Sequence, residues 1–95
     1  MTDPELLILA SLAGGPRHGY GMMVDIQVMA GVRLGPGTLY GAIPRMEEDG
    51  LIEALESEDR RRPYRLTARG ATVLRERLEA MRELSSTALA RLGAG

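Results

Sequence analysis

The sequence predicts a mostly helical α+β fold, in which three helices precede a two-stranded wing and one long helix follows it. Helical patterns alternate with turn signals over residues 4–50, and a short basic hairpin follows the third helical segment. From residue 71 onward, a heptad repeat extends almost to the end of the sequence. This order of elements is that of a winged helix-turn-helix with a long C-terminal helix.

Composition limits the class of protein. The 95 residues fit one small domain, and 44% of them are apolar, which is enough for a core. Because there is no cysteine and only one histidine, we expect no disulfide, no metal site and no cofactor. No apolar run is long enough to span a bilayer and no signal-peptide pattern is present, which predicts a cytoplasmic protein without a membrane partner.

Charge is segregated along the chain. The net charge is −1, which argues against a generic binder of polyanions. Residues 47–59 hold seven acidic residues and no basic one, whereas residues 60–69 hold five arginines and no acid. The distribution of charge therefore carries more information than its total.

The first helix has clear start and stop signals. Asp3 is a good N-cap, Pro4 suits the first helical position and Glu5 favours the positive end of the helix dipole. The helix then runs through residues 6–13 and stops at the Gly-Gly-Pro sequence of residues 14–16. Because it is apolar nearly all round, we expect one face against its own core and another against a second subunit.

The next two helices are predicted over residues 18–30 and 36–49, each followed by a glycine that can end it. Pro44, with Gly41 beside it, predicts a kink or an early end of the third helix, because an interior proline removes a backbone donor. Three apolar residues of this helix are expected to face inward: Leu39, Ile43 and Met46.

Residues 51–56 and 62–66 are expected to form two short strands, joined by a polar wing tip at residues 57–61. Pro63 cannot donate to a ladder, which predicts a sheet edge at that point. Thr67 is expected to cap the last helix. The heptad seam of that helix consists of seven residues: Ala71, Leu74, Leu78, Met81, Ser85, Ala88 and Leu92.

Four segments carry a resemblance to a known family. They are Gly-Pro-Arg-His-Gly-Tyr-Gly at 15–21, Pro-Gly-Thr-Leu-Tyr at 36–40, Gly-Leu-Ile-Glu at 50–53 and Arg-Arg-Arg-Pro-Tyr-Arg-Leu-Thr-Ala-Arg-Gly at 60–70. Over roughly residues 4–70, the chain resembles the PadR family of bacterial transcriptional regulators.

The resemblance implies a sequence-specific DNA-binding transcriptional regulator, expected to be a repressor that a small-molecule effector or another signal relieves. Residues 1–67 would form the winged helix-turn-helix DNA-binding domain. Residues 68–95 would form the C-terminal dimerisation helix, where that family keeps its dimerisation element, and both parts would make one structural unit.

The third helix is the expected recognition helix, because helix-turn-helix proteins place the N-terminal part of this helix in the major groove. Arginines of the wing suit the DNA backbone or the minor groove. The residues expected to contact double-stranded DNA are Pro36, Gly37, Thr38, Tyr40 and Arg45 of the third helix, Arg60, Arg61 and Arg62 of the wing, and, by resemblance, His18 and Tyr20. For the single histidine, packing or capping of the second helix is the alternative role.

A homodimer is expected, because the seam extends past the point where a core of this size could cover it. A two-fold dimer calls for a two-fold-symmetric operator. The expected interface residues are Leu6, Leu9, Leu74, Leu78, Met81, Ala88 and Leu92. No catalytic motif is present, so we do not expect an enzyme.

An alternative function rests on departures from the family pattern. Family members usually carry a proline near position 41 and a basic or other helix-favouring residue near 44, whereas this chain has Gly41 and Pro44. Together with the acidic stretch 47–59, these residues favour a dimeric winged-helix interaction module with weakened or lost DNA reading.

Overall fold

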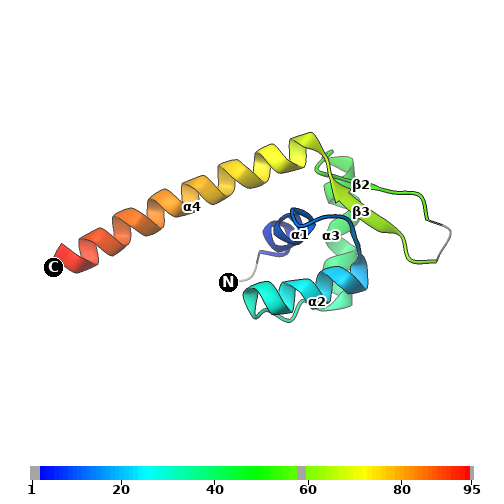
Figure 1. Ribbon diagram of the computed structural model, residues 1–95, viewed down its shortest axis with the longest axis horizontal. Coiled ribbons are helices and arrows are strands. Elements are labelled where there is room, and N and C mark those ends of the chain that lie inside the picture. Colours follow the sequence, from blue (N-terminus) through cyan, green and yellow to red (C-terminus); the bar gives the residue numbers. More distant parts are fainter. Residues whose placement is uncertain (1–2, 58–59, 95) are drawn as a thin grey trace.

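The computed structural model describes residues 3–57 and 60–94. Its elements are α1 (Pro4–Leu12), β1 (Arg17–His18), α2 (Gly19–Ala30), α3 (Pro36–Glu48), β2 (Ile52–Ala54), β3 (Pro63–Leu66) and α4 (Ala68–Ala94). The first three helices gather beside a small sheet, and α4 projects from them as a long arm (Figure 1), which gives the molecule its extents of 57 × 26 × 20 Å. The predicted mostly helical, winged helix-turn-helix fold is confirmed.

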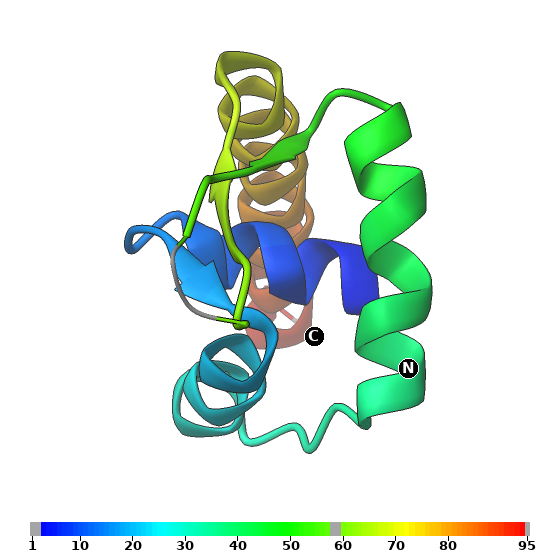
Figure 2. The same cartoon turned by 90° about the vertical axis from the view of Figure 1, so that its right-hand side faces the viewer.

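The core lies around α1, which crosses the middle of the molecule between α2 and α3 (Figure 2). Buried apolar residues of all three helices meet there, and Leu51, Ile52 and Leu74 close the core from the wing and α4. The inward-facing residues predicted for α3 are all buried: Leu39, Ile43 and Met46.

Side-chain caps begin three of the helices. Asp3, His18 and Thr67 each accept a hydrogen bond from the amide three residues further on, at 3.1, 3.2 and 3.0 Å. Gly31 and Gly50 follow α2 and α3 with φ values of 68° and 73°, a left-handed conformation that favours glycine. These boundaries agree with the start and stop signals in the sequence.

The third helix continues through Pro44 to Glu48 without interruption (Figure 2), so the predicted early end is wrong. Pro44 lacks the amide that would donate to the carbonyl of Tyr40, and its ring crowds that carbonyl. It lies on the exposed side of α3, where water can satisfy the carbonyl. Ile43 and Met46, both buried, hold the helix against the core on either side of the proline.

The sheet has three antiparallel strands in the order β1-β3-β2. The two strands of the wing, β2 and β3, form as predicted, and residues 58–59 of the predicted wing tip lie outside the described residues. β1 comes from residues interpreted as a turn. Since His18 pairs with Pro63, β3 is the central strand and Pro63 does not mark a sheet edge. The proline is tolerated because it is the first residue of β3, and its carbonyl still accepts from the amide of Leu55 at 2.9 Å.

Three contacts fix the first turns of α4. Gly70 lies so close to the carbonyl of Leu51 that a β-carbon would overlap it. Arg69 donates to the carbonyl of Asp49 at 2.9 Å, and Arg77 pairs with Asp3 at the start of α1. Beyond residue 77, α4 is exposed on every side up to residue 94. Among the described residues, no helix, α4 included, is both long and apolar enough to cross a membrane.

Candidate nucleic-acid interface

A hollow of about 280 Å³ lies where the start of α2, the first turns of α3 and the wing meet; we call it the wing hollow. Its lining residues are His18, Gly19, Tyr20, Tyr40, Arg60, Arg61, Arg62 and Tyr64. It thus brings together six of the ten residues predicted to contact DNA. All of the charged side chains in this described lining are arginines, so the hollow suits an anion.

Tyr40 connects α3 to α2 inside this hollow. A β-carbon on Gly19 would overlap the hydroxyl and ring of Tyr40, so the tyrosine lies directly on the backbone of the first turn of α2. Half of Tyr40 and 61% of Tyr20 remain exposed. Glycine at position 19 therefore leaves the space that the ring and hydroxyl of Tyr40 occupy, in the hollow that the three arginines also line.

His18 has the capping role that the sequence left open. Its Nδ1 accepts the hydrogen bond from the amide of Gly21, which leaves Nε2 as the ring atom that can carry a proton and donate. Pairing with Pro63 also ties this histidine to the base of the wing. The cap and the strand pairing together hold the ring at the edge of the hollow.

The wing supplies the positive charge. Arg60, Arg61 and Arg62 are exposed and precede β3. Arg65, two residues further on from Pro63, forms a cross-strand ion pair with Glu53 at 2.5 Å. Because a carboxylate partner neutralises Arg65, this residue adds little to the positive potential of the wing.

Tyr64 also lines the wing hollow, although its sequence pattern did not predict this. Partial burial, together with the nearby carboxylate of Glu47, raises the pKa of Tyr64 above 10.0, although Arg62 opposes the shift. The phenol therefore stays protonated and remains a hydrogen-bond donor. Pairing of β1 with β3, which places Tyr64 opposite Arg17, brings it there.

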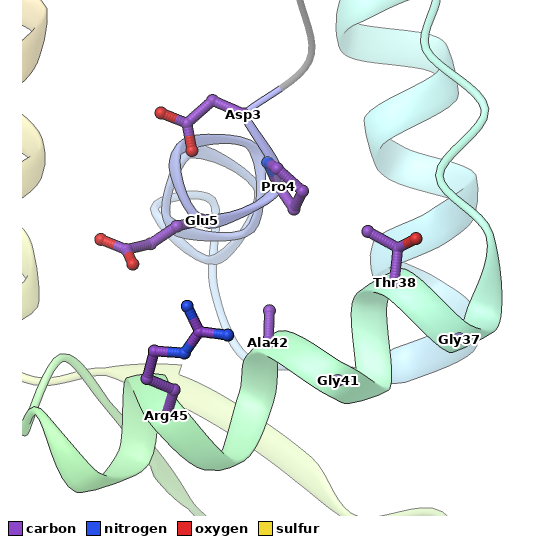
Figure 3. A pocket seen from close by; sticks show the side chains of 8 residues that line it. All are labelled: Asp3, Pro4, Glu5, Gly37, Thr38, Gly41, Ala42 and Arg45. Atoms are coloured by element: carbon purple, nitrogen blue, oxygen red, sulfur yellow. The ribbon is translucent and has the colours of Figure 1, made fainter.

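A second hollow, of about 420 Å³, separates the first turn of α1 from α3; we call it the α1–α3 hollow. Thr38 and Arg45 point into it from α3, and the guanidinium of Arg45 extends toward Glu5 (Figure 3). Asp3 lines the same hollow. Three predicted DNA residues, Gly37, Thr38 and Arg45, thus lie here beside two carboxylates, and Pro36 lies exposed at the start of α3.

Asp3 has a double role at this second hollow. Burial alone would raise the pKa of Asp3, but the hydrogen bond from the amide of Leu6 and the Arg77 guanidinium outweigh burial and lower it. Arg77 also lies 3.5 Å from Glu5. The same carboxylate therefore caps α1 and anchors α4.

The residues predicted for a dimer interface divide into two groups. Leu9 and Leu74 are 0% and 6% exposed, so the expectation that they meet a second subunit is wrong: both belong to the chain's own core. The others leave surface accessible: Leu6 is partly exposed, and Leu78, Met81, Ala88 and Leu92 are exposed along α4.

Within residues 3–57 and 60–94, no group of three histidine, cysteine, aspartate or glutamate side chains could hold a metal ion.

Comparison with known proteins identifies the family to which this sequence is similar. Residues 8–76 match the model of the transcriptional regulator PadR-like family. The chain is 38% identical to the transcriptional regulator Rv3488 of Mycobacterium tuberculosis over 91 residues, which cover 90% of this chain and 81% of that protein. It is 43% identical over 84 residues to an uncharacterized 37.1 kDa protein in transposon TN4556 of Streptomyces fradiae, of which it spans only 24%, against 88% of this chain.

A solved structure of the same family has a similar fold. A PadR family transcription regulator from hypervirulent Clostridium difficile R20291 superposes with a TM-score of 0.80 at 26% identity, over 88% of this chain and 92% of that one. The matched family is one of transcriptional regulators and not of enzymes. Since its model matches more than two thirds of the sequence, the chain belongs to the PadR-like family of transcriptional regulators.

Proposed function

We propose that this protein is a sequence-specific DNA-binding transcriptional regulator, which lays α3 in the major groove and the wing along the neighbouring backbone. The wing hollow supports this proposal best. It collects Arg60, Arg61 and Arg62 beside the first turns of α2 and α3, and phosphate contacts from arginine, tyrosine and helix N-termini are what position a helix-turn-helix on DNA.

The placement of the acidic residues is compatible with this proposal. Glu47 and Glu48 lie at the C-terminal end of α3, whereas helix-turn-helix proteins insert the N-terminal part of the recognition helix. The acidic residues of the α1–α3 hollow, Asp3 and Glu5, have Arg77 as a partner. A net charge of −1 for the chain therefore does not prevent a positive potential at the wing hollow.

The test is DNA binding at several salt concentrations, with the duplex upstream of the protein's own gene and a random duplex. Each neutralised phosphate contributes about −0.9 to the slope of log K against log salt, so Arg61→Ala combined with Arg62→Ala should make the slope shallower by about two. Arg91→Ala, which removes a charge from the far end of α4, is the control and should leave the slope unchanged. Equal, feeble binding of the wild type to every sequence would contradict the proposal.

We further propose a homodimer in which α4 and the partly exposed side of α1 meet their counterparts. The apolar residues of α4 beyond its anchored turns are exposed, with Leu78 at 46%, Met81 at 50% and Leu92 at 77%, and a surface of this kind marks an association site. A two-fold dimer would hold two α3 helices roughly 34 Å apart, one turn of DNA, and so would bind a two-fold-symmetric operator.

Light scattering tests the dimer. Leu78→Glu combined with Met81→Glu should give a monomer at micromolar concentration, because the two charges would lie within the seam. Thr87→Glu places a charge on the opposite side of α4 and should leave the dimer intact. A monomeric wild type, or a double variant that stays dimeric, would refute the proposed interface.

We also propose that the protein acts in the cytoplasm as a repressor that a small molecule relieves. An apolar hollow of about 500 Å³ between α1 and α4, lined in part by Leu6, Leu7 and Met81, offers space for such a ligand. A reporter gene behind the upstream region tests the sign of regulation: deletion of the regulator should raise reporter output, and lowered output would identify an activator.

The alternative function is a dimeric interaction module that has lost DNA reading. One observation favours it: the exposed side of α3 carries Gly41 and Pro44 and leads to acidic residues. The variant Pro44→Arg discriminates between the two functions. If the wild type fails to bind any DNA and this variant binds, the interaction module is the correct assignment.

A further inference from the structure

The side of α3 that points away from the core has an unusual composition. Leu39, Ile43 and Met46 are buried, and at 100° per residue the opposite line of the helix runs through four other residues. These are Gly37, Gly41, Pro44 and Glu48, all exposed. A β-carbon added at either glycine would meet nothing within 4 Å, so this outward line is open to solvent and carries no side-chain hydrogen-bond donor.

The donors that α3 does possess flank that line, and two of them, Thr38 and Arg45, share the α1–α3 hollow with Gly37 and Gly41. Thr38 and Arg45 point into the α1–α3 hollow (Figure 3), and Arg45 faces the carboxylate of Glu5. On the other flank, the hydroxyl of Tyr40 lies on the backbone of Gly19. From these flanks, threonine, arginine and tyrosine can reach the sugar-phosphate backbone, whereas the base edges face the outward line.

Given the proposed DNA-binding function, on which this step rests, we infer that α3 recognises thymine methyl groups and groove shape, and not the hydrogen-bonding edges of guanine or adenine. Gly37, Gly41 and Pro44 form a smooth surface that allows the helix backbone to approach the base pairs closely. Glu48, the fourth residue of the outward line, is the last residue of α3 and lies away from the N-terminal part that enters the groove. The C5 methyl of thymine is the apolar group that the major groove displays. The ring of Pro44 and the Cα atoms of Gly37 and Gly41 can pack against it.

The wing favours the same base pairs by a different physical route. Arg60, Arg61 and Arg62 are exposed next to α3, and arginine is drawn into narrow minor grooves, which occur at A-tracts. The protein therefore selects runs of A·T pairs both beneath α3 and beneath the wing. Its operator is defined by thymine methyl groups and by the width of the minor groove.

Selection from a random duplex library, followed by base analogues, tests this inference. Replacing thymine by uracil removes one methyl group and should weaken binding about fourfold at each position beneath α3, the equivalent of roughly 0.8 kcal/mol for one buried carbon. Replacing guanine by 7-deazaguanine removes the N7 acceptor and should change binding less than about twofold. A selected guanine whose 7-deaza replacement costs tenfold or more would overturn the inference.

Variants of the protein separate the inference from the proposed function. Arg45→Met should weaken all duplexes to a similar extent and keep the selected consensus, and loss of a base preference in this variant would overturn the inference. Pro44→Arg places a donor on the outward line and should add a preference for guanine. If the library yields no enriched duplex at all, the proposed function fails first, whereas an enriched but guanine-dependent consensus rejects the inference alone.

Discussion

Gly19 and Tyr40 offer the sharpest test of the interface geometry. A β-carbon on Gly19 would overlap the hydroxyl and ring atoms of Tyr40, whereas a β-carbon on Gly21, in the same helical turn, would meet the His18 ring at an ordinary 3.5 Å. Neither glycine has a positive φ. Gly19→Ala and Gly21→Ala therefore share the same backbone change and differ in the clash with the tyrosine.

The expected magnitudes follow from this geometry. Alanine in place of glycine in a helix gains about 0.5–1 kcal/mol, and a first-turn position gains no more than this. Overpacking costs typically about 1–3 kcal/mol. Because half of Tyr40 is exposed, its ring can swing outward, and we expect the lower part of that range, about 1–2 kcal/mol. Gly21→Ala should thus be neutral or stabilising, and Gly19→Ala should be less stable than Gly21→Ala by that amount.

Urea unfolding at one fixed protein concentration measures the difference, since association would otherwise change the apparent stability. The double variant Gly19→Ala, Tyr40→Ala removes the clash, so in that background Gly19→Ala should become as favourable as Gly21→Ala. DNA affinity should fall for Gly19→Ala and stay near the wild-type value for Gly21→Ala. If Gly19→Ala stabilises the wild type as much as Gly21→Ala does, Tyr40 does not contact the backbone of α2 at Gly19, and the described geometry of the wing hollow is wrong.

Three further predictions concern the packing of α4 and the tyrosine at position 64, which lines the wing hollow. Gly70→Ala should destabilise the fold by about 2–3 kcal/mol in urea unfolding, because its β-carbon would overlap the backbone carbonyl of Leu51; an unchanged midpoint would contradict this packing. Asp3→Asn keeps the cap but loses the ion pair with Arg77, and since both partners are more than a third exposed the loss should be about 0.5–1 kcal/mol at pH 7. As the pKa of Asp3 is lowered from 3.8, the wild type's advantage should persist above pH 4 and vanish as the pH falls through the native pKa; a difference that survives at pH 2 would refute the ion-pair explanation. Burial and Glu47 raise the pKa of the Tyr64 phenol above 10.0. Tyr64→Phe should therefore remove the part of the tyrosinate absorbance that develops above pH 10.0 in a spectrophotometric titration.

The fold could be predicted because the signals for each element were local. Asp3, Thr67 and the glycines that end α2 and α3 act within one turn of the helix, so the residue types alone locate the boundaries. Pro44 shows where local reasoning fails. It costs one backbone hydrogen bond and a close contact between its ring and the carbonyl of Tyr40. The tertiary packing of Ile43 and Met46 outweighs that cost, and helix propensity does not include this packing.

The candidate site was predicted in part for the same reason. Arginines of the wing and the start of α3 belong to segments with recognisable patterns. The strand β1 depends on a partner more than forty residues away, so Arg17 gives no strand signal of its own, and the role of Tyr64 depends on that pairing. Arg45 was assigned to DNA from its helix alone, whereas its side chain points into the α1–α3 hollow, toward Glu5 of a different helix (Figure 3).

The anchoring of α4 links the two proposed activities mechanically. Arg69 bonds to the carbonyl of Asp49, the residue that caps α3, and Arg77 joins the same arm to Asp3 of α1. With Gly70 closely packed against Leu51 as a third contact, α4 cannot pivot without disturbing the end of α3. In a dimer joined through α4, the separation of the two α3 helices is then set by the direction in which α4 leaves the core. Inserting about five base pairs, half a turn of DNA, between the operator half-sites should therefore prevent both subunits of the dimer from binding at the same time. The described part of α4 is one continuous helix, so it has no flexible segment that could compensate.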